Sequence, residues 1–294
     1  MTASFRDVYV NAPDGLKLHA WDTGPIAGDR LPVVCLPGLT RTVEDFEALG
    51  LALANDTATP RRVVAIEYRG RGLSGYDPDP SKYSVPVEAG DVLTILGALG
   101  LSRVIAVGTS RGGLISMGLS ATHPDLWGGV VLNDIGPALE IDGLVRIKGY
   151  VGSDRAMPAS WDEAVAAAKT MFGRDFPNLT DAEWMAWARR AFRERDGRFE
   201  RTYDAALAAT LAAVTRDNPL PTIWELFDAM QGKPLMVVHG KLSDLLSAQG
   251  VQDMKARRPD MEIVEVADQG HAPLLADAPT IARIAAFCAR CDAA

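Results

Sequence analysis

The chain has 294 residues, of which 48% are hydrophobic and 23% are charged, and its formal net charge at pH 7 is -8. This length supports one large core, alone or with a smaller accessory lobe. The negative balance argues against a surface that binds nucleic acid or an anionic membrane, because basic residues gather only in short pairs such as Arg61-Arg62.

Neither a targeting segment nor a membrane segment is recognisable in the sequence. The N-terminus "MTASFRDVYV" lacks the basic and apolar regions of a secretory signal. No apolar run reaches the roughly 18 residues of a membrane helix. The three cysteines lie in a strand-like run (Cys35) and on a C-terminal helical pattern (Cys288 and Cys291). We therefore expect a cytoplasmic chain with reduced thiols and no bound metal.

The elements begin with a predicted antiparallel hairpin, residues 5–11 and 16–24 around the turn "APDG". Apolar strands then alternate with helical patterns, which predicts a mostly parallel sheet covered on both faces. The predicted strands are 31–38, 61–70, 103–108, 127–134, 233–240 and 261–268, and the predicted helices are 43–55, 86–100, 110–124, 247–259 and 279–291.

The alternation breaks after Asn133-Asp134, where residues 137–224 carry helical patterns only. A strand pattern resumes at "KPLMVVHG". The sequence therefore predicts a core domain formed by residues 1–136 and 225–294, with a helical cap domain of residues 137–224 inserted between two of its strands.

A serine stands between a predicted strand and a predicted helix in "GTSRG", Gly108 to Gly112. The G-x-S-x-G pattern in this context places a serine hydroxyl on a sharp turn above the sheet edge. The two glycines let strand and helix approach closely. We predict that Ser110 is a nucleophile; the alternative is an ordinary serine N-cap.

A serine nucleophile needs a base, and His271 is the strongest candidate among the four histidines. It follows the last predicted strand in "VADQGHAPLL", at the edge where open α/β sheets place their sites. His239 ends another strand and is the only serious rival, because His19 lies in the hairpin and His123 at a helix end.

The base needs a carboxylate that orients it, and two candidates follow strands. Asp244 lies in "VVHGKLSDLLS" and Asp134 in "VVLNDIGP". The chain order Ser110, Asp244, His271 is the usual one for this arrangement, so we favour Asp244. Asp134 then anchors the start of the inserted helices.

An oxyanion hole needs two backbone N–H donors. Arg111 supplies one at the start of the helix after Ser110, and Leu39 supplies the other from the loop "LPGLT" after a strand. The alternative for that loop is an ordinary Pro-Gly turn. Side chains that we expect to line the pocket are Thr40, Arg41 or Phe46 beside this loop and Trp161, Trp184 and Trp187 in the cap, where a small core of the cap's own is the alternative.

These motifs together resemble the α/β-hydrolase fold superfamily, in its branch of capped serine hydrolases and carboxylesterases. The resemblance covers nearly the whole chain, through "LPGLTRTVEDFEALG", "AIEYRGRGLSGYDPDPSKYSV", "VGTSRGGLISMGLSATHPDLWGGVVLNDIGP", "HGKLSDLL" and "GHAPLL". It implies an eight-stranded core sheet with a helical cap. It also implies a Ser110–His271–Asp244 triad, an oxyanion hole of Leu39 and Arg111, and an acyl-enzyme intermediate.

Two positions depart from the pattern of many members. Pro37-Gly38 stands where His-Gly is common, and Arg111 stands where Met or another apolar residue often follows the nucleophile. Neither change removes a backbone donor. Arg111 weakens the match to carbon–carbon bond hydrolases that carry "SMGG" here.

The leading functional prediction is a serine carboxylesterase without cofactor or metal, acting on a small-molecule ester with an apolar part, which includes small polyester oligomers. A lactonase or a carbon–carbon bond hydrolase is the enzymatic alternative, and a non-catalytic ligand receptor on the same fold is a third. If Arg146 and Lys148 face the cavity, the substrate carries a carboxylate. We expect no nucleic-acid or membrane partner, and a monomer or homodimer.

Overall fold

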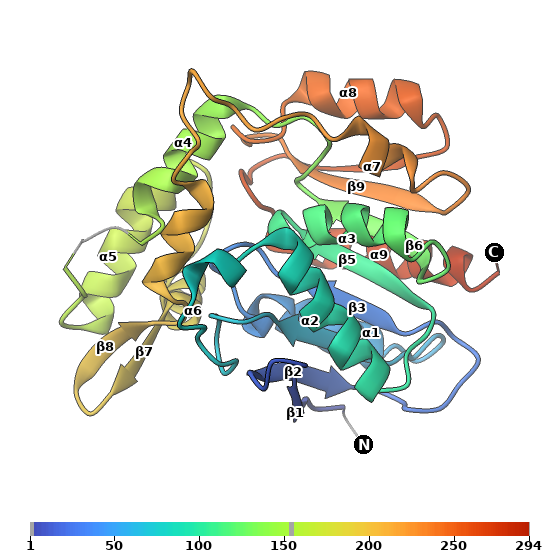
Figure 1. The fold of residues 1–294 in the computed structure, drawn as a ribbon, viewed down its shortest axis with the longest axis horizontal. Helices are drawn as coiled ribbons and strands as arrows, with labels where there is room; N and C mark the ends of the chain where they lie inside the picture. Colours follow the sequence, from blue (N-terminus) through green and yellow to red (C-terminus); the bar gives the residue numbers. More distant parts are fainter. Residues whose placement is uncertain (1–2, 153–155, 294) are drawn as a thin grey trace.

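A computed structural model describes residues 3–152 and 156–293 of the chain. Its centre is an eight-stranded sheet with strand order β1-β2-β4-β3-β5-β6-β9-β10 (Figure 1). The strands are β1 (Arg6–Asn11), β2 (Lys17–Thr23), β3 (Val33–Leu36), β4 (Val63–Glu67), β5 (Val104–Thr109), β6 (Trp127–Asn133), β9 (Leu235–Gly240) and β10 (Glu262–Val266).

Strand direction agrees with the sequence patterns. β1 pairs antiparallel with β2, as the N-terminal hairpin predicted, and β2 also pairs antiparallel with β4. All the other pairs are parallel. The prediction of a mostly parallel eight-stranded sheet is therefore confirmed.

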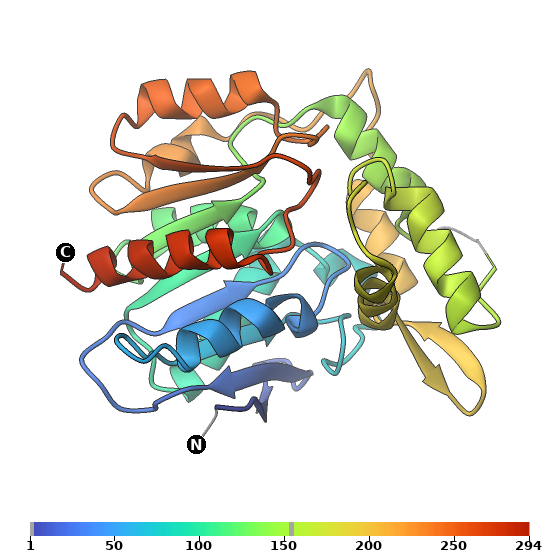
Figure 2. The ribbon, with the colours of Figure 1, turned by 180° about the vertical axis from the view of Figure 1, so that it is seen from behind.

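Helices cover both faces of the sheet. Alternate residues of each parallel strand therefore lie in two different apolar clusters, one on each face. Val34 of β3 belongs to the cluster that contains residues of α2, α3, α7 and α8, and its neighbour Cys35 belongs to the cluster that contains residues of α1 and α9. Figure 2 shows α1 and α9 lying across that second face. The bounds are α1 (Glu47–Ala54), α2 (Val85–Ala98), α3 (Arg111–Thr122), α7 (Trp224–Asp228), α8 (Ala248–Arg257) and α9 (Ala278–Cys291), with short helices η1 (Val43–Phe46) and η2 (Pro80–Lys82).

Between β6 and β9 the chain leaves the sheet and forms a separate layer beside the carboxyl ends of the strands (Figure 1). This insert contains α4 (Ile141–Tyr150), α5 (Trp161–Phe172), α6 (Asp181–Ala191), the hairpin β7 (Phe192–Arg195) and β8 (Arg198–Arg201), and η3 (Ala205–Leu211).

The hairpin corrects our expectation that residues 137–224 are helical only. Its turn is formed by Asp196 and Gly197, which both have positive φ (51° and 73°). An Asp-Gly pair is the preferred turn of a two-residue hairpin, so the sequence carried a signal that the helical patterns around it obscured.

Cys35, Cys288 and Cys291 are all buried free thiols. Among the helices within residues 3–152 and 156–293, none combines the length and apolar character needed to cross a bilayer.

Candidate active site

Ser110 occupies the corner between β5 and α3. Its backbone has φ 50° and ψ -110°, a left-handed conformation that costs a non-glycine residue free energy. The Ser110 N–H donates to the carbonyl of Asn133 at 3.1 Å, which ties the corner to the end of β6. The turn therefore holds the serine in a strained conformation at the carboxyl edge of the sheet.

The glycines on either side of Ser110 are required by space. A Cβ on Gly112 would overlap the carbonyl oxygen of Leu36 in β3. A Cβ on Gly108 would lie 2.6 Å from the carbonyl carbon of Gly112. The corner can form only because strand and helix backbones touch directly.

Replacing Gly112 with alanine is expected to lower the free energy of unfolding by about 3 kcal/mol, because α3 would have to move away from β3. Gly118 on the same helix has open space around it, with no atom within 4 Å of the point that a Cβ would occupy. The matched change Gly118→Ala is expected to raise stability by about 0.5–1 kcal/mol. Urea unfolding measures both values, and equal effects of the two changes would contradict the steric argument.

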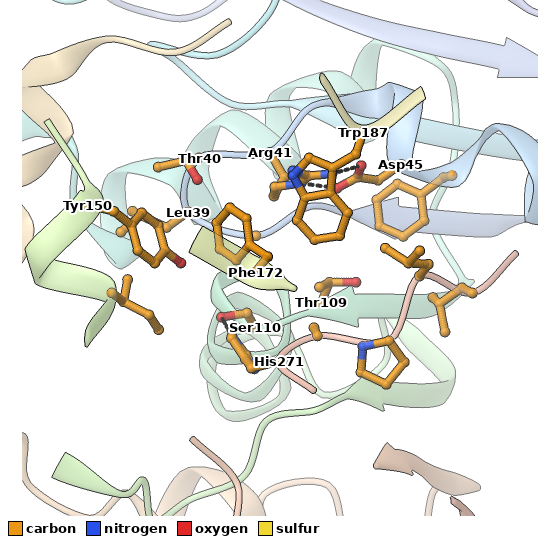
Figure 3. A pocket seen from close by; sticks show the side chains of 17 residues that line it. Leu39, Thr40, Arg41, Asp45, Thr109, Ser110, Tyr150, Phe172, Trp187 and His271 are labelled. Carbon is orange, nitrogen blue, oxygen red and sulfur yellow. Dashed lines mark hydrogen bonds and ion pairs between the residues drawn. The ribbon is translucent and has the colours of Figure 1, made fainter. Parts of the chain in front are cut away.

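His271 lies directly against Ser110. Its Nε2 is 2.9 Å from Ser110 Oγ, and its Nδ1 is 2.8 Å from a carboxylate oxygen, Oδ2 of Asp134. Figure 3 shows Ser110 and His271 side by side at the cavity. The three side chains form a continuous hydrogen-bonded series of the kind in which serine becomes nucleophilic.

The carboxylate in this series corrects our sequence prediction, which favoured Asp244. Asp134 follows β6 without an intervening residue, and β6 pairs with β5, the strand that ends just before Ser110. Its positive φ of 54° places it in an uncommon backbone conformation at the strand end. Asp134 is therefore held next to His271 by strand order and by its position immediately after a strand.

Further donors hold the Asp134 carboxylate, whose side chain is fully buried. Oδ1 accepts the backbone N–H of Gly240 at 2.9 Å, and Oδ2 accepts the hydroxyl of Ser243 at 2.6 Å. These bonds fix both oxygens, so the carboxylate is oriented before any substrate binds.

Asp244 is held by a different partner. Arg146 of α4 donates from Nε and Nη2 to its two oxygens at 2.5 and 2.6 Å. Burial by itself would raise the pKa of the Asp244 carboxyl, but the hydrogen bonds and charge of Arg146 hold that pKa below its usual value. Asp244 therefore joins the insert to the core, and it is not hydrogen-bonded to His271.

His239, the rival base, lies away from the serine. It is buried, and its Nε2 is 3.0 Å from the carbonyl oxygen of Leu246. The His239 ring therefore contacts a loop backbone, and His271 is the histidine beside Ser110.

The loop after β3 and the start of α3 are joined through a buried ionic series. Glu88 of α2 accepts from Arg111 Nε at 2.6 Å and from Arg71 Nη1 at 2.5 Å. Arg71 in turn donates from Nε to the carbonyl of Leu39 at 2.8 Å. Glu88 and Arg71 are both fully buried. Within residues 3–152 and 156–293, the backbone N–H groups of Leu39 and Arg111 have no acceptor.

Two cavities meet at this site. The smaller, about 90 Å³, contains Ser110 and His271 in its wall (Figure 3). The larger, about 410 Å³, lies under α5, α6 and the hairpin. They share a wall formed by Thr40, Arg41, Tyr150, Phe172 and Trp187.

The predicted pocket residues divide between the cavities and the interior of the insert. Thr40 and Trp187 line both cavities. Trp184 packs in an apolar cluster within the insert, and Trp161 stacks edge-on against Phe199. Neither of these two indoles is among the cavity walls just described. The wall residues Tyr150 and Phe172, which we did not predict, are the last residues of α4 and α5. A helical pattern by itself does not show which of its aromatic residues faces a cavity.

Comparison with known proteins decides the family. The Alpha/beta hydrolase family profile matches residues 33–284. The chain belongs to the alpha/beta hydrolase family. This hydrolase shares its fold with an alpha/beta hydrolase from Novosphingobium aromaticivorans, with a TM-score of 0.88 and 39% identity over 97% of this chain and 98% of the other.

Two curated relatives carry named activities. The hydrolase is 33% identical over 302 residues to the 3-hydroxybutyrate-oligomer hydrolase of Cupriavidus necator, which covers 96% of this chain and 97% of the relative. It is 26% identical over 234 residues to the 2-(acetamidomethylene)succinate hydrolase of Mesorhizobium japonicum, covering 80% and 79% of the two chains.

The two cations that we considered as contacts for a charged substrate are occupied elsewhere in this hydrolase. Arg146 binds Asp244 and lies 3.3 Å from Asp175. Lys148 donates to the carbonyls of Ala212 and Val214. Neither side chain lines the cavities beside Ser110.

Proposed function

We propose that this hydrolase cleaves carboxylic esters with apolar parts through Ser110, including short oligoesters of hydroxy acids. The observation that carries the proposal is the hydrogen-bonded series from Ser110 Oγ through His271 to the buried Asp134. This is the arrangement that activates a serine for acyl transfer.

In the proposed reaction, Ser110 Oγ attacks the ester carbonyl while His271 Nε2 takes its proton. Asp134 holds the ring so that Nδ1–H faces the carboxylate and stabilises the imidazolium. The carbon–oxygen bond then breaks, and His271 returns the proton to the leaving alcohol. Water attacks the acyl-enzyme, gives a proton to His271, and the acid leaves as Ser110 regains its hydrogen.

We further propose that the backbone N–H groups of Leu39 and Arg111 stabilise the oxyanion. Both N–H groups are without an acceptor in the described structure, and Arg111 begins a helix, whose N-terminus favours negative charge. Leu39 lines the same cavity as Ser110.

The aromatic side chains of the insert favour an apolar substrate, and we propose that the insert forms a cap over the site. Tyr150 of α4, Phe172 of α5 and Trp187 of α6 form the wall that the two cavities share. Burial raises the pKa of Tyr150 to about 12, so its phenol stays neutral at ordinary pH. The larger cavity, of about 410 Å³, leaves room for a second ester unit. This agrees with the oligomeric substrate in the name of the Cupriavidus relative.

Labelling with a fluorophosphonate, together with a substrate panel, tests the proposal. We expect covalent modification at Ser110 by peptide mass and rapid release from p-nitrophenyl esters of short or medium acyl length. The panel also contains a lactone and a vinylogous diketo acid. Turnover confined to either of these would establish the lactonase or the carbon–carbon bond hydrolase instead. Ligand binding without turnover of any compound would indicate a receptor.

The buried series through Glu88 makes a separate prediction about the oxyanion hole. Glu88→Gln is expected to lower kcat about 10- to 100-fold, because Arg71 and Arg111 would no longer hold the Leu39 loop and α3 in register. The affinity for a trifluoromethyl ketone, which forms an oxyanion on the serine, should fall in the same proportion while KM for the ester changes little.

Two further variants separate positioning from loss of folding. Arg71→Lys keeps the positive charge but removes the guanidinium that joins Glu88 to Leu39, so it should reproduce the kcat effect. Glu47→Gln, at an exposed site on α1, is the control. A rise in KM without loss of inhibitor affinity would contradict the positioning role, and thermal melting shows whether each variant is folded.

A further inference from the structure

Arg41 stands in the wall between the two cavities, and its guanidinium is held on one edge and one face. Nε and Nη2 donate to the two oxygens of Asp45 at 2.6 and 2.5 Å. The guanidinium carbon lies 4.8 Å from the ring centroid of Trp187 on α6. Figure 3 shows the Trp187 ring overlapping the end of Arg41, with dashed lines from Arg41 to Asp45. The side chain is therefore fixed in direction before a ligand arrives.

The opposite edge of the guanidinium is open. An arginine offers one pair of N–H groups at Nε and Nη2 and a second pair at its two terminal nitrogens. Asp45 takes the first pair. Nη1 has no acceptor within residues 3–152 and 156–293, and it is not among the buried atoms without a partner. Because Arg41 lines both cavities, this second pair is available at the site.

The charges around Arg41 are not balanced. Asp45 lies near two cations, since Nη1 of Arg190 on α6 is 3.9 Å from Oδ1. The three side chains are about one-fifth exposed. Glu44 also acts electrostatically on Arg41, and its Oε1 lies 3.7 Å from Nη2 of Arg193. Three cations thus share two carboxylates, which leaves an excess positive charge around Arg41 in the wall of the cavity that contains Ser110. A ligand carboxylate would complete the cluster.

We infer that Arg41, supported by Arg190, binds the free carboxylate of an ester substrate and directs this hydrolase to the acid-terminated ends of oligoesters. The inference rests on the proposed ester hydrolysis and names its substrate class. Arg41 lies two residues after Leu39 and lines the cavity that contains Ser110. We therefore expect the free carboxylate of the hydroxy acid unit that carries the scissile ester oxygen to reach the open guanidinium edge. A planar carboxylate is the group that a free guanidinium edge binds in bidentate form.

The experiment compares one substrate in two forms, the dimer of 3-hydroxybutyrate as the free acid and as its methyl ester. The measured quantity is the ratio of kcat/KM for cleavage of the internal ester in the acid to kcat/KM for cleavage of the internal ester in the methyl ester. This ratio cancels changes in the serine chemistry. We expect the wild-type ratio to exceed about 10, since a hydrogen-bonded charge pair is typically worth a factor of this size or more.

The variants Arg41→Gln and Arg190→Gln should both lower this ratio, Arg41→Gln by at least about tenfold and Arg190→Gln by less. Arg41→Lys keeps a charge without the planar edge and should fall between Arg41→Gln and wild type. The matched control is Arg189→Gln on the same helix, because Arg189 stacks on Trp161 and does not line the two cavities. It should leave the ratio unchanged.

A wild-type ratio near one, or a ratio that Arg41→Gln and Arg41→Lys leave unchanged, would overturn the inference while ester hydrolysis itself stands. Failure to cleave both dimers together with all p-nitrophenyl esters would instead overturn the proposed function. A salt titration gives an independent reading, because the acid preference should decrease as ionic strength rises.

Discussion

Ser110→Ala is expected to lower kcat for p-nitrophenyl esters by about 10⁶-fold, since removal of a serine nucleophile leaves only binding and oxyanion stabilisation. The hydroxyl is the group within 2.9 Å of His271 Nε2 at the corner between β5 and α3. The alanine variant retains a Cβ in the same backbone conformation, so its melting temperature should stay close to wild type.

Steady-state kinetics at high enzyme concentration measures the residual rate of this variant. Ser81→Ala, at an exposed serine in η2, controls for handling and should match wild type. Turnover by Ser110→Ala within about a hundredfold of wild type would assign the nucleophile elsewhere, because loss of the true nucleophile could not leave so much activity.

Asp134→Asn is expected to lower kcat by about 10⁴-fold, because an amide beside Nδ1 favours the wrong tautomer of His271. The change preserves side-chain shape, and the acceptor contact to the Gly240 N–H can remain through the amide oxygen. Asp244→Asn should cost less than about tenfold, since Asp244 binds Arg146 and is not hydrogen-bonded to His271.

Comparing these two variants decides which aspartate orients His271, because each of the two follows a strand of the same sheet. A larger loss from Asp244→Asn than from Asp134→Asn would contradict this assignment and would make Asp244 the carboxylate that orients His271. Melting curves of both proteins are needed, since Asp134 also holds Gly240 and Ser243. The proportion of each variant that fluorophosphonate labels would show whether an inactive protein still presents Ser110.

Local patterns in the sequence were sufficient for most of the fold. Apolar β-branched runs predicted every strand of the sheet within a few residues, because a strand that is buried in the sheet needs apolar residues along its length. Ser110 could be predicted for the same reason: its strand–turn–helix setting is local, and Gly108 and Gly112 are needed by direct contact. His271 was chosen because it follows the last strand, and the structure does bring it beside Ser110.

The pairing of side chains across loops was decided by the tertiary structure. Asp134 and Asp244 both follow strands, and chain order favoured Asp244, but strand order places β6 next to the strand of Ser110 while Arg146 of the insert binds Asp244. The orientation of Arg41 likewise depends on Asp45 and on Trp187, a residue far away in sequence. Sequence alone therefore determined which residues end each strand. Packing between distant segments determined which of those side chains touch, because contacts of this kind depend on the path of every intervening element.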